Sequence, residues 1–457
     1  MSIVKPRTMP GVLELLPLEQ VAFQRMIDTI RTEFERFGFL PVATPAMELK
    51  DVLLTKMGGE TERQVYLAQS SGARDRDHEP DLALRFDLTV PLARYVAEHE
   101  DQLTFPFRRY QLQPVFRGES PQHGRYREFF QCDIDVIGRD RLSIRYDAEI
   151  PAVIAGVFER LAFGGFTIRV SNRKVLKGVL GYLGVAESEQ QMLILREVDK
   201  LERRGPGEVA NALVELGMAS ESAQQMLDIV GFGPAAGEAM FEQLDRLPTG
   251  DRLVGEGVAE LRQVFELMDS LGVDSSRYAL DLSIARGLDY YTGTVYETLL
   301  NDHAGLGSIC SGGRYDDLAS LYTPTRLPGV GISIGLTRLF AQLHQIGVIK
   351  ASESTVAVLV TLLDQEGLGQ NLKLATALRE AGINTETVLE PARLGGQLKY
   401  ADRSGIRLAV ICGENERSAG SVAIRDLAAK QQVEVPSADV VQAVRTLLAS
   451  TKPGDAL

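Results

Sequence analysis

The chain has 457 residues, of which 44% are hydrophobic and 24% charged, and its formal net charge is −13. This composition is that of a globular protein with enough apolar material for large cores, divided over two to four domains of about 150 residues each. The negative charge argues against a general nucleic-acid binder, because phosphate contacts need Lys and Arg, although a local basic surface remains compatible with it.

The sequence also argues against export, membrane insertion and a cysteine-based site. The basic residues among the first ten are followed by no apolar run, and no stretch approaches the roughly 18 apolar residues of a membrane span. Cys132, Cys310 and Cys412 lie far apart, without C-x-x-C spacing or paired histidines, which predicts neither disulfides nor a zinc site. A reducing cytoplasm is the expected setting.

The first predicted element is a helix over Leu18–Phe37, which has apolar residues at helical spacing and ends before Gly38. Between residues 81 and 300 several stretches alternate with a period of two, which predicts antiparallel strands. From about 174 to 271 the pattern changes to successive helices. Gly184, Gly217 and Gly272 separate them, and each suits a left-handed helix C-cap. We expect this segment to be a helical insert in a larger domain.

A second boundary is predicted in the polar stretch 347–354. Beyond it, apolar strand candidates alternate with amphipathic helices, at 356–363, 370–381, 408–412 and 438–448. This alternation predicts a compact α/β domain of about 100 residues.

Residues 81–89 contain the first polar group that could carry chemistry. As a strand, this segment places Arg85, Asp87 and Thr89 on one face and its apolar residues on the other. A carboxylate and a hydroxyl would then stand side by side. The alternative is a half-exposed strand followed by a helix cap.

A predicted hairpin over 105–138 has an unusual polar face. One strand contributes Arg109, Gln111, Gln113 and Arg117 to it, and the returning strand contributes Arg127, Phe129, Gln131, Asp133 and Asp135. An arginine fork can bind a phosphate through two hydrogen bonds, and an aromatic ring can stack on a base. The alternative is a solvated sheet face without a ligand.

Two further segments suggest a nucleotide site. Arg286 is predicted at a strand end, where a cation could complement charge on a reacting phosphate, although the tyrosines that follow are also common packing residues. Gly329, Gly331, Ser333 and Gly335 leave one strand face nearly bare, so a flat ligand could approach the backbone. The glycine patterns of P-loop and Rossmann nucleotide sites are absent from the sequence.

Together these segments resemble the class II aminoacyl-tRNA synthetases and, within that class, the histidyl-tRNA synthetase family. Residues 38–45, 116–129 and 335–339 resemble the three class motifs, and 286–291 and 311–316 resemble segments typical of the histidyl family. In the tail, 397–402, 405–407 and 413–414 resemble the family's anticodon-binding domain.

The resemblance implies an α+β fold: a class II catalytic core on an antiparallel sheet flanked by helices, with a helical insert and a C-terminal α/β anticodon-binding domain. The implied domains are 1–350, with the insert at about 174–271, and 355–457. The implied activity is histidine–tRNA ligation. L-histidine and ATP form histidyl-adenylate and pyrophosphate, and histidine then passes to the 3′ end of tRNA(His). A cytoplasmic homodimer is expected.

The resemblance also implies roles for individual residues. Arg117 and Arg286 would contact the α-phosphate of ATP and, with Gln131, form the catalytic set. Arg338 would hold the triphosphate tail, Phe129 would stack on adenine and Glu119 would contact its edge. The histidine pocket would comprise Asp87, Leu88, Thr89, Arg117, Gln131, Asp135, Arg286, Tyr290 and Tyr291. Asp135 and Tyr291 would bind the imidazole. No metal site in the protein is expected, and Mg²⁺ would be bound mainly by the ATP phosphates.

This chain departs from the family pattern at several places. Its opening Arg7–Gly11 and the loop residues Ser120 and His123 differ, and Asp87 and Asp135 stand where some members carry glutamate. Two alternatives remain. One is the regulatory paralogue that partners ATP phosphoribosyltransferase, which usually lacks the anticodon domain and the arginine–tyrosine motif. The other is an RNA-binding or scaffold protein built on the same fold.

Overall fold

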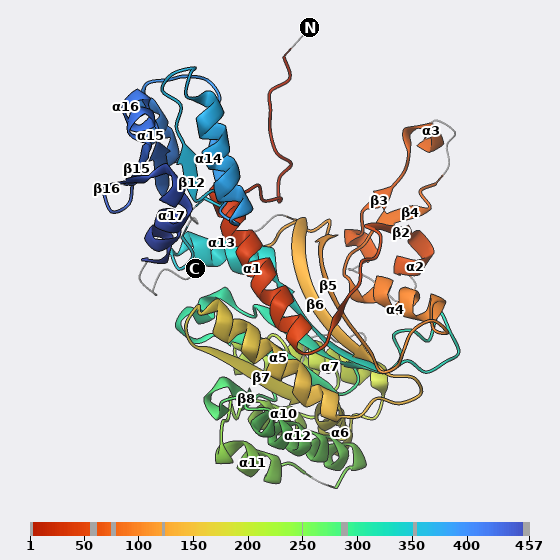
Figure 1. The fold of residues 1–457 in the computed structure, drawn as a ribbon. Helices are drawn as coiled ribbons and strands as arrows, with labels where there is room; N and C mark the ends of the chain where they lie inside the picture. The colour runs from red at the N-terminus through yellow and green to blue at the C-terminus, as the bar shows by residue number, and fades with distance from the viewer. Residues whose placement is uncertain are drawn as a thin grey trace. The chain divides into compact units, whose positions relative to one another are not determined.

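The computed structural model describes residues 3–54, 62–74, 79–120, 124–248, 250–284, 291–350 and 354–450. The chain forms two compact units, one made of Met1–Leu13 and Ile27–Leu343 and the other of Glu14–Met26 and His344–Leu457 (Figure 1). None of the described helices is long and apolar enough to span a membrane.

The first unit is built on an eight-stranded sheet with the order β1-β5-β6-β11-β10-β9-β7-β8. These strands are β1 (Leu40–Pro41), β5 (Phe107–Phe116), β6 (Glu128–Ile137), β7 (Phe166–Asn172), β8 (Tyr278–Leu280), β9 (Thr294–Leu300), β10 (Cys310–Tyr315) and β11 (Gly329–Gly335). Neighbouring strands are antiparallel except for β1–β5 and β7–β8 at the two edges. The prediction of an antiparallel core sheet is confirmed, with one parallel pair at each edge.

The β5–β6 hairpin has the two faces that its alternation predicts. The register pairs Arg109 with Asp135, Gln111 with Asp133 and Gln113 with Gln131, so these side chains share one face. On the other face Cys132, Ile134 and Val136 are fully buried. Helix α5 (Arg145–Leu161) crosses the sheet and contacts β7 and β11 (Figure 1). The helix covers the apolar face, so the polar face is left to hold a site.

The structure corrects the prediction of a strand over 81–89. The strand β4 covers only Leu82–Leu84, in a three-stranded sheet with β2 (Met47–Leu49) and β3 (Leu67–Ala68). Arg85 leaves the ladder because its guanidinium is buried, where it donates to the carbonyl oxygens of Thr44 at 2.7 Å and Pro114 at 2.8 Å. The chain then turns into helix α4 (Thr89–Glu98). Arg85, Asp87 and Thr89 therefore do not share a strand face.

Besides its two sheets, the first unit contains several short helical elements. They are α2 (Lys50–Leu54), α3 (Ser71–Arg74), α13 (Leu336–Gln345), η1 (Glu62–Gln64), η2 (Ser275–Arg277) and η3 (Asn301–Leu306). The first predicted helix is α1 (Pro17–Arg36), and the following Gly38 has the expected positive φ of 77°.

Between β7 and β8 the chain forms a run of helices. They are α6 (Arg173–Tyr182), α7 (Ser188–Val198), α8 (Leu201–Arg204), α9 (Pro206–Glu215), α10 (Ser220–Val230), α11 (Glu238–Asp245) and α12 (Arg252–Ser270). Gly184, Gly217 and Gly272 follow helix ends with φ of 89°, 93° and 81°, as predicted. Helix α12 packs tightly on α6, since a Cβ at Gly257 would lie 2.9 Å from the Val175 backbone nitrogen. The longest helix of this run is thereby fixed to the end of β7.

The second unit has its own five-stranded sheet with the order β13-β12-β14-β15-β16. Its elements are β12 (Val358–Val360), β13 (Thr385–Thr387), β14 (Leu408–Ile411), β15 (Ser421–Asp426), β16 (Gln431–Pro436), α14 (Leu368–Glu380), α15 (Leu394–Arg403), α16 (Glu414–Ala419), η4 (Ser437–Asp439) and α17 (Val440–Ala449). Strands β13, β12 and β14 are parallel, and the remaining pairs are antiparallel. This is the predicted α/β organisation.

Candidate active site

A cavity of about 360 Å³ lies over the polar face of the first sheet. It is lined by Arg117, Glu119, Gly124, Arg125, Tyr126, Phe129, Gln131, Ser308, Ile309, Cys310, Ser311, Ser333, Gly335 and Arg338. These residues come from the β5–β6 connection, from the connection between η3 and β10, from β6, β10 and β11, and from the first turn of α13. Five of the predicted site residues are therefore brought together: Arg117, Glu119, Phe129, Gln131 and Arg338.

Arg117 is held between two aromatic rings. Its guanidinium carbon lies 4.4 Å from the centroid of the Phe86 ring and 4.9 Å from that of Phe129. Its Nε also donates to the Phe86 carbonyl oxygen at 3.3 Å. Contacts of this kind restrict the arginine to one orientation, so its remaining N–H groups are fixed relative to the cavity. Phe86 was not predicted as a partner of Arg117, because the predicted strand placed it on the apolar face.

Two more cations line the cavity. Arg338 is in the first turn of α13, and its Nη2 donates to the carbonyl oxygen of Leu306 at 2.7 Å. Arg125, to which the sequence assigned no role, lies 3.4 Å from the Glu119 carboxylate. Glu119 is the only described lining residue with a carboxylate. With three guanidinium groups and one carboxylate, the described lining favours an anionic ligand such as a polyphosphate.

The bare face predicted for β11 is only partly open. A Cβ at Gly329 would lie 2.4 Å from the Tyr315 ring, and one at Gly331 would lie 2.0 Å from the Asp135 carboxylate. At Gly335 nothing lies within 4 Å of the equivalent position. The glycines at 329 and 331 therefore make room for protein side chains, and space for a ligand remains only toward Gly335.

Asp135 is a buried carboxylate with two strong partners. Its Oδ1 accepts from the Tyr315 hydroxyl at 2.8 Å, and its Oδ2 lies 2.6 Å from Nη2 of Arg109, a fully buried arginine. Burial raises the pKa of Asp135 to about 6, although the charge of Arg109 and the hydrogen bond from Tyr315 oppose the shift. Asp135 does not line the cavity described above.

Asp133 lies one step along the same face and is 3% exposed. Burial raises its pKa to about 7; Arg109 and a hydrogen bond from Ser333 oppose this rise, and Asp135 and Asp87 add to it. The sequence placed Asp133 on the polar face without a role. The structure makes it part of a group of three carboxylates around Arg109.

Asp87 belongs to the same electrostatic group, although it precedes helix α4. Its Oδ1 accepts from the Val90 amide at 3.0 Å, which caps the helix. Burial raises the pKa of Asp87, and the Val90 bond and the charge of Arg117 act in the opposite direction. Leu88 is fully buried and Thr89 is the first residue of α4. None of these three residues lines the cavity described above.

Of the predicted histidine-specific residues, Tyr291 is described and Arg286 and Tyr290 lie outside the described residues. A Cβ at Gly313 would lie 3.0 Å from the Tyr291 ring. Gly313 pairs with Gly331, and Gly331 pairs with Asp135. The Tyr291 ring, from the segment before β9, and Asp135 of β6 therefore lie near the same transverse row of the sheet, with β10 and β11 between β9 and β6.

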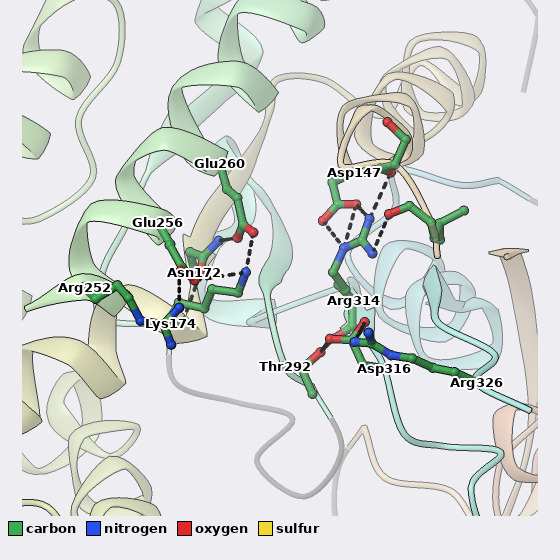
Figure 2. Close-up of polar contacts among 12 residues, drawn as sticks. Asp147, Asn172, Lys174, Arg252, Glu256, Glu260, Thr292, Arg314, Asp316 and Arg326 are labelled. Carbon is green, nitrogen blue, oxygen red and sulfur yellow. Dashed lines mark hydrogen bonds and ion pairs between the residues drawn. The ribbon is translucent and has the colours of Figure 1, made fainter. Parts of the chain in front are cut away.

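A buried ion pair between Arg314 and Asp147 joins β10 to helix α5 (Figure 2). The Nε of Arg314 lies 3.1 Å and 3.0 Å from the two carboxylate oxygens of Asp147, near the start of α5. Its Nη1 and Nη2 donate to the carbonyl oxygens of Leu142 and Ser143. Nearby, the Thr292 hydroxyl donates to Asp316 at 2.6 Å. These contacts fix the strand that carries Ser311 and Tyr315.

A second cluster in Figure 2 joins the helical run to the sheet. The side-chain amide of Asn172, at the end of β7, donates to Glu260 of α12 at 2.9 Å. Lys174 contacts the same carboxylate and lies 4.0 Å from Glu256. The cluster therefore anchors α12 next to Thr294, with which Asn172 pairs across β7 and β9.

The comparisons with known proteins agree along the whole chain. A model of the histidyl-tRNA synthetase family matches residues 11–339, and one of an anticodon-binding domain matches residues 355–447. A histidine–tRNA ligase of Stenotrophomonas maltophilia is 55% identical over 98% of this chain and 100% of its own length. The crystal structure of histidyl-tRNA synthetase from a Nostoc species has a TM-score of 0.89 at 39% identity, covering 97% of this chain and 100% of that one.

A structure from Bacillus halodurans described as an ATP phosphoribosyltransferase regulatory subunit/histidyl-tRNA synthetase shares the fold, with a TM-score of 0.73. It is only 18% identical, over 90% of this chain and 99% of that one, so the fold alone does not separate the enzyme from the regulatory alternative. The 55% identity to a ligase and the match to the anticodon-binding domain do separate them. They confirm the predicted fold class and enzyme class: the chain belongs to the histidyl-tRNA synthetase family.

Proposed function

We propose that this chain activates L-histidine with ATP, forming histidyl-adenylate and pyrophosphate, and then transfers histidine to the 3′ end of tRNA(His). The observation that carries this proposal is the fixed Arg117 guanidinium, which shares one cavity with Gln131 and Arg338. In-line attack of a carboxylate on a phosphate needs positioned cations and little covalent chemistry from the protein.

ATP would lie in the cavity with its phosphates toward the arginines. Arg117 would hold the α-phosphate and Arg338 the triphosphate tail, while Glu119 would contact the edge of the adenine. Phe129 has one ring face toward Arg117, and adenine would stack on the opposite face. Because Glu119 is the only carboxylate among the described lining residues, Mg²⁺ would be held mainly by the phosphates.

Histidine would bind beside ATP, over the carboxylates of the polar face. Asp135 and Tyr291 would bind the imidazole, while Asp87, Thr89 and Gln131 would orient the ammonium and carboxylate groups. Neutral imidazole has one N–H donor and one acceptor nitrogen. A site that satisfies both discriminates against apolar amino acids, whose binding would leave its polar groups unpaired. Leu88, which is fully buried next to Asp87, completes the proposed set of histidine-pocket residues on this segment.

Two further residues of the proposed site lie outside the described residues, so their roles are proposed from the sequence alone. Arg286 would approach the same α-phosphate as Arg117 and stabilise the pentavalent transition state. Tyr290 would line the histidine pocket. We further propose a cytoplasmic homodimer with domains at 1–350 and 355–457, in which the second domain contacts the anticodon of tRNA(His).

The test is ATP–pyrophosphate exchange by the purified full chain, with Mg²⁺ and each of the twenty amino acids in turn. Exchange is expected with histidine alone. Arg117→Ala and Arg286→Ala should each lower the rate by about 10²-fold or more, because each removes a transition-state cation. Arg246→Ala, at an exposed position on the helical run, is the matched control and should leave the rate unchanged. No exchange from well-folded wild-type protein would refute the proposed function.

A further inference from the structure

The connection between β5 and β6 carries side chains that we propose for ATP binding, and its backbone must be ordered to place them. Strand β5 ends at Phe116 and β6 begins at Glu128. Arg117 and Glu119 therefore lie beyond the strand ladder. One more backbone hydrogen bond follows the ladder, from the Arg117 amide to the Arg127 carbonyl oxygen at 2.8 Å. Past that bond, the position of Glu119 depends on contacts other than strand pairing.

The side chain of Arg127 supplies such a contact. Its Nε donates to the Glu119 carbonyl oxygen at 3.1 Å, across the eight residues that separate the two positions. The Glu119 carboxylate, by contrast, lies 3.4 Å from Arg125, whose side chain is 62% exposed. An ion pair so open to solvent fixes a carboxylate weakly. The hydrogen bond from Arg127 to the main chain is therefore the stronger constraint on Glu119.

The N-terminal segment of the chain holds Arg127 in turn. The Gly11 carbonyl oxygen accepts from the Arg127 amide at 2.6 Å, and the Pro10 carbonyl oxygen accepts from its Nη1 at 3.4 Å. Gly11 has a φ of 84°, in the left-handed region that favours glycine, so the turn that presents these two oxygens depends on this residue. The opening segment 7–11, which departs from the family pattern, thus contacts the proposed ATP-binding connection.

An arginine suits this arrangement better than a neutral side chain would. A guanidinium has five N–H donors in one rigid plane, so Arg127 keeps the Glu119 and Pro10 carbonyl oxygens at a fixed separation. Arg127 does not line the cavity, and its described side-chain hydrogen bonds all lead to backbone carbonyl oxygens. Apart from its charge, it can affect a bound nucleotide only through the residues that it holds.

We propose that Arg127 is a positioning residue, which holds the Glu119 carboxylate at the edge of adenine and thereby makes the site selective for that base. Adenine presents an N–H₂ donor at this edge, whereas hypoxanthine, the base of inosine triphosphate, presents a carbonyl oxygen there. A fixed carboxylate accepts from the first and repels the second, but a carboxylate that can move away discriminates less. This inference rests on the proposed function, because it takes Glu119 as a contact of ATP.

The test measures base selection in ATP–pyrophosphate exchange by the full chain with histidine and Mg²⁺. The two quantities are the KM for ATP and the inhibition constant of inosine triphosphate against ATP. Arg127→Met keeps an unbranched side chain and removes every side-chain donor. In this variant the KM for ATP should rise about 10-fold, the effect of losing one hydrogen bond between a charged group and the base. The inhibition constant of inosine triphosphate and the KM for histidine should each change less than about threefold.

This comparison separates positioning from the loss of a positive charge. Both nucleotides carry the same triphosphate, so a weaker electrostatic attraction would affect them alike. Gly11→Ala strains the turn that presents the two carbonyl oxygens, and it should give the same selective change at a smaller size. Adding it to Arg127→Met should have no further effect, because both substitutions act through one contact.

Arg445→Met is the matched control. Arg445 also donates to a backbone carbonyl oxygen, that of Ala381 at 2.8 Å, but it is exposed and belongs to the second unit. Both constants should therefore keep their wild-type values in this variant.

An equal change for the two nucleotides in Arg127→Met, or no change in the folded variant, would overturn the proposal. If Arg127→Met does not fold, the same comparison with Gly11→Ala decides. Wild-type protein that exchanges with histidine but binds inosine triphosphate as tightly as ATP would overturn this proposal alone. Wild-type protein that shows no exchange would instead overturn the proposed function, and this proposal with it.

Discussion

Replacing Asp133 by asparagine should stabilise the folded protein at pH 8 and much less at pH 5. The folded protein raises the pKa of this carboxyl from its ordinary 3.8 to about 7, so it holds the proton more tightly than the unfolded chain does. The stability of the folded protein is therefore greatest below pH 3.8 and declines as the pH rises from there to about 7. Above about pH 7 the folded protein bears the full cost of ionising this carboxyl. Asparagine has no such cost.

The size of the effect follows from the shift. Each pKa unit corresponds to about 1.4 kcal/mol, so ionising Asp133 in the folded protein costs about 4 kcal/mol above pH 7. Between pH 5 and pH 8 the wild type loses the part of this stability that corresponds to about two pKa units, or about 3 kcal/mol. At about 2 °C for each kcal/mol, the difference in Tm between variant and wild type should grow by about 5 °C over this range.

Thermal denaturation of both proteins at several pH values measures that difference. Asp274→Asn is the matched control. Hydrogen bonds from Ser276 lower the pKa of Asp274, so it is ionised throughout this range and the Tm difference should not vary with pH. A difference between the Asp133→Asn protein and the wild type that is constant from pH 5 to pH 8 would refute the reasoning.

Two other substitutions test the geometry of the site. Gly331→Ala should raise the KM for histidine in the exchange assay, because its Cβ would meet the Asp135 carboxylate at 2.0 Å. Gly335→Ala, whose Cβ points into open space in the cavity, should raise the KM for ATP and leave that for histidine unchanged; the opposite pattern would contradict our placement of the two substrates. Arg314→Met should destabilise the protein by about 3–5 kcal/mol in thermal denaturation, since it leaves Asp147 buried without its cation. Adding Asp147→Asn to that variant should restore part of the loss, and no restoration would mean that the charge is not the cause.

The sequence alone was sufficient for features that depend on local periodicity. The alternation over 105–138 placed Gln131, Asp133 and Asp135 on one face, because successive side chains of a strand point to opposite sides. The glycines at helix ends were equally predictable, since a left-handed residue there favours glycine. The family motifs, which are short and contiguous, identified the enzyme class.

Contacts between distant segments were decided only by the tertiary structure. The sequence did not predict that Phe86 stacks on Arg117, because strand β4 ends where buried Arg85 finds carbonyl partners on other segments. Alternation assigned Asp133 to a face but could not show that β11 would pair with β6 and set Ser333 opposite it. Local patterns determine which face a side chain takes, whereas the partner across that face depends on strand pairing between segments about 200 residues apart, which only the packing of the whole unit determines.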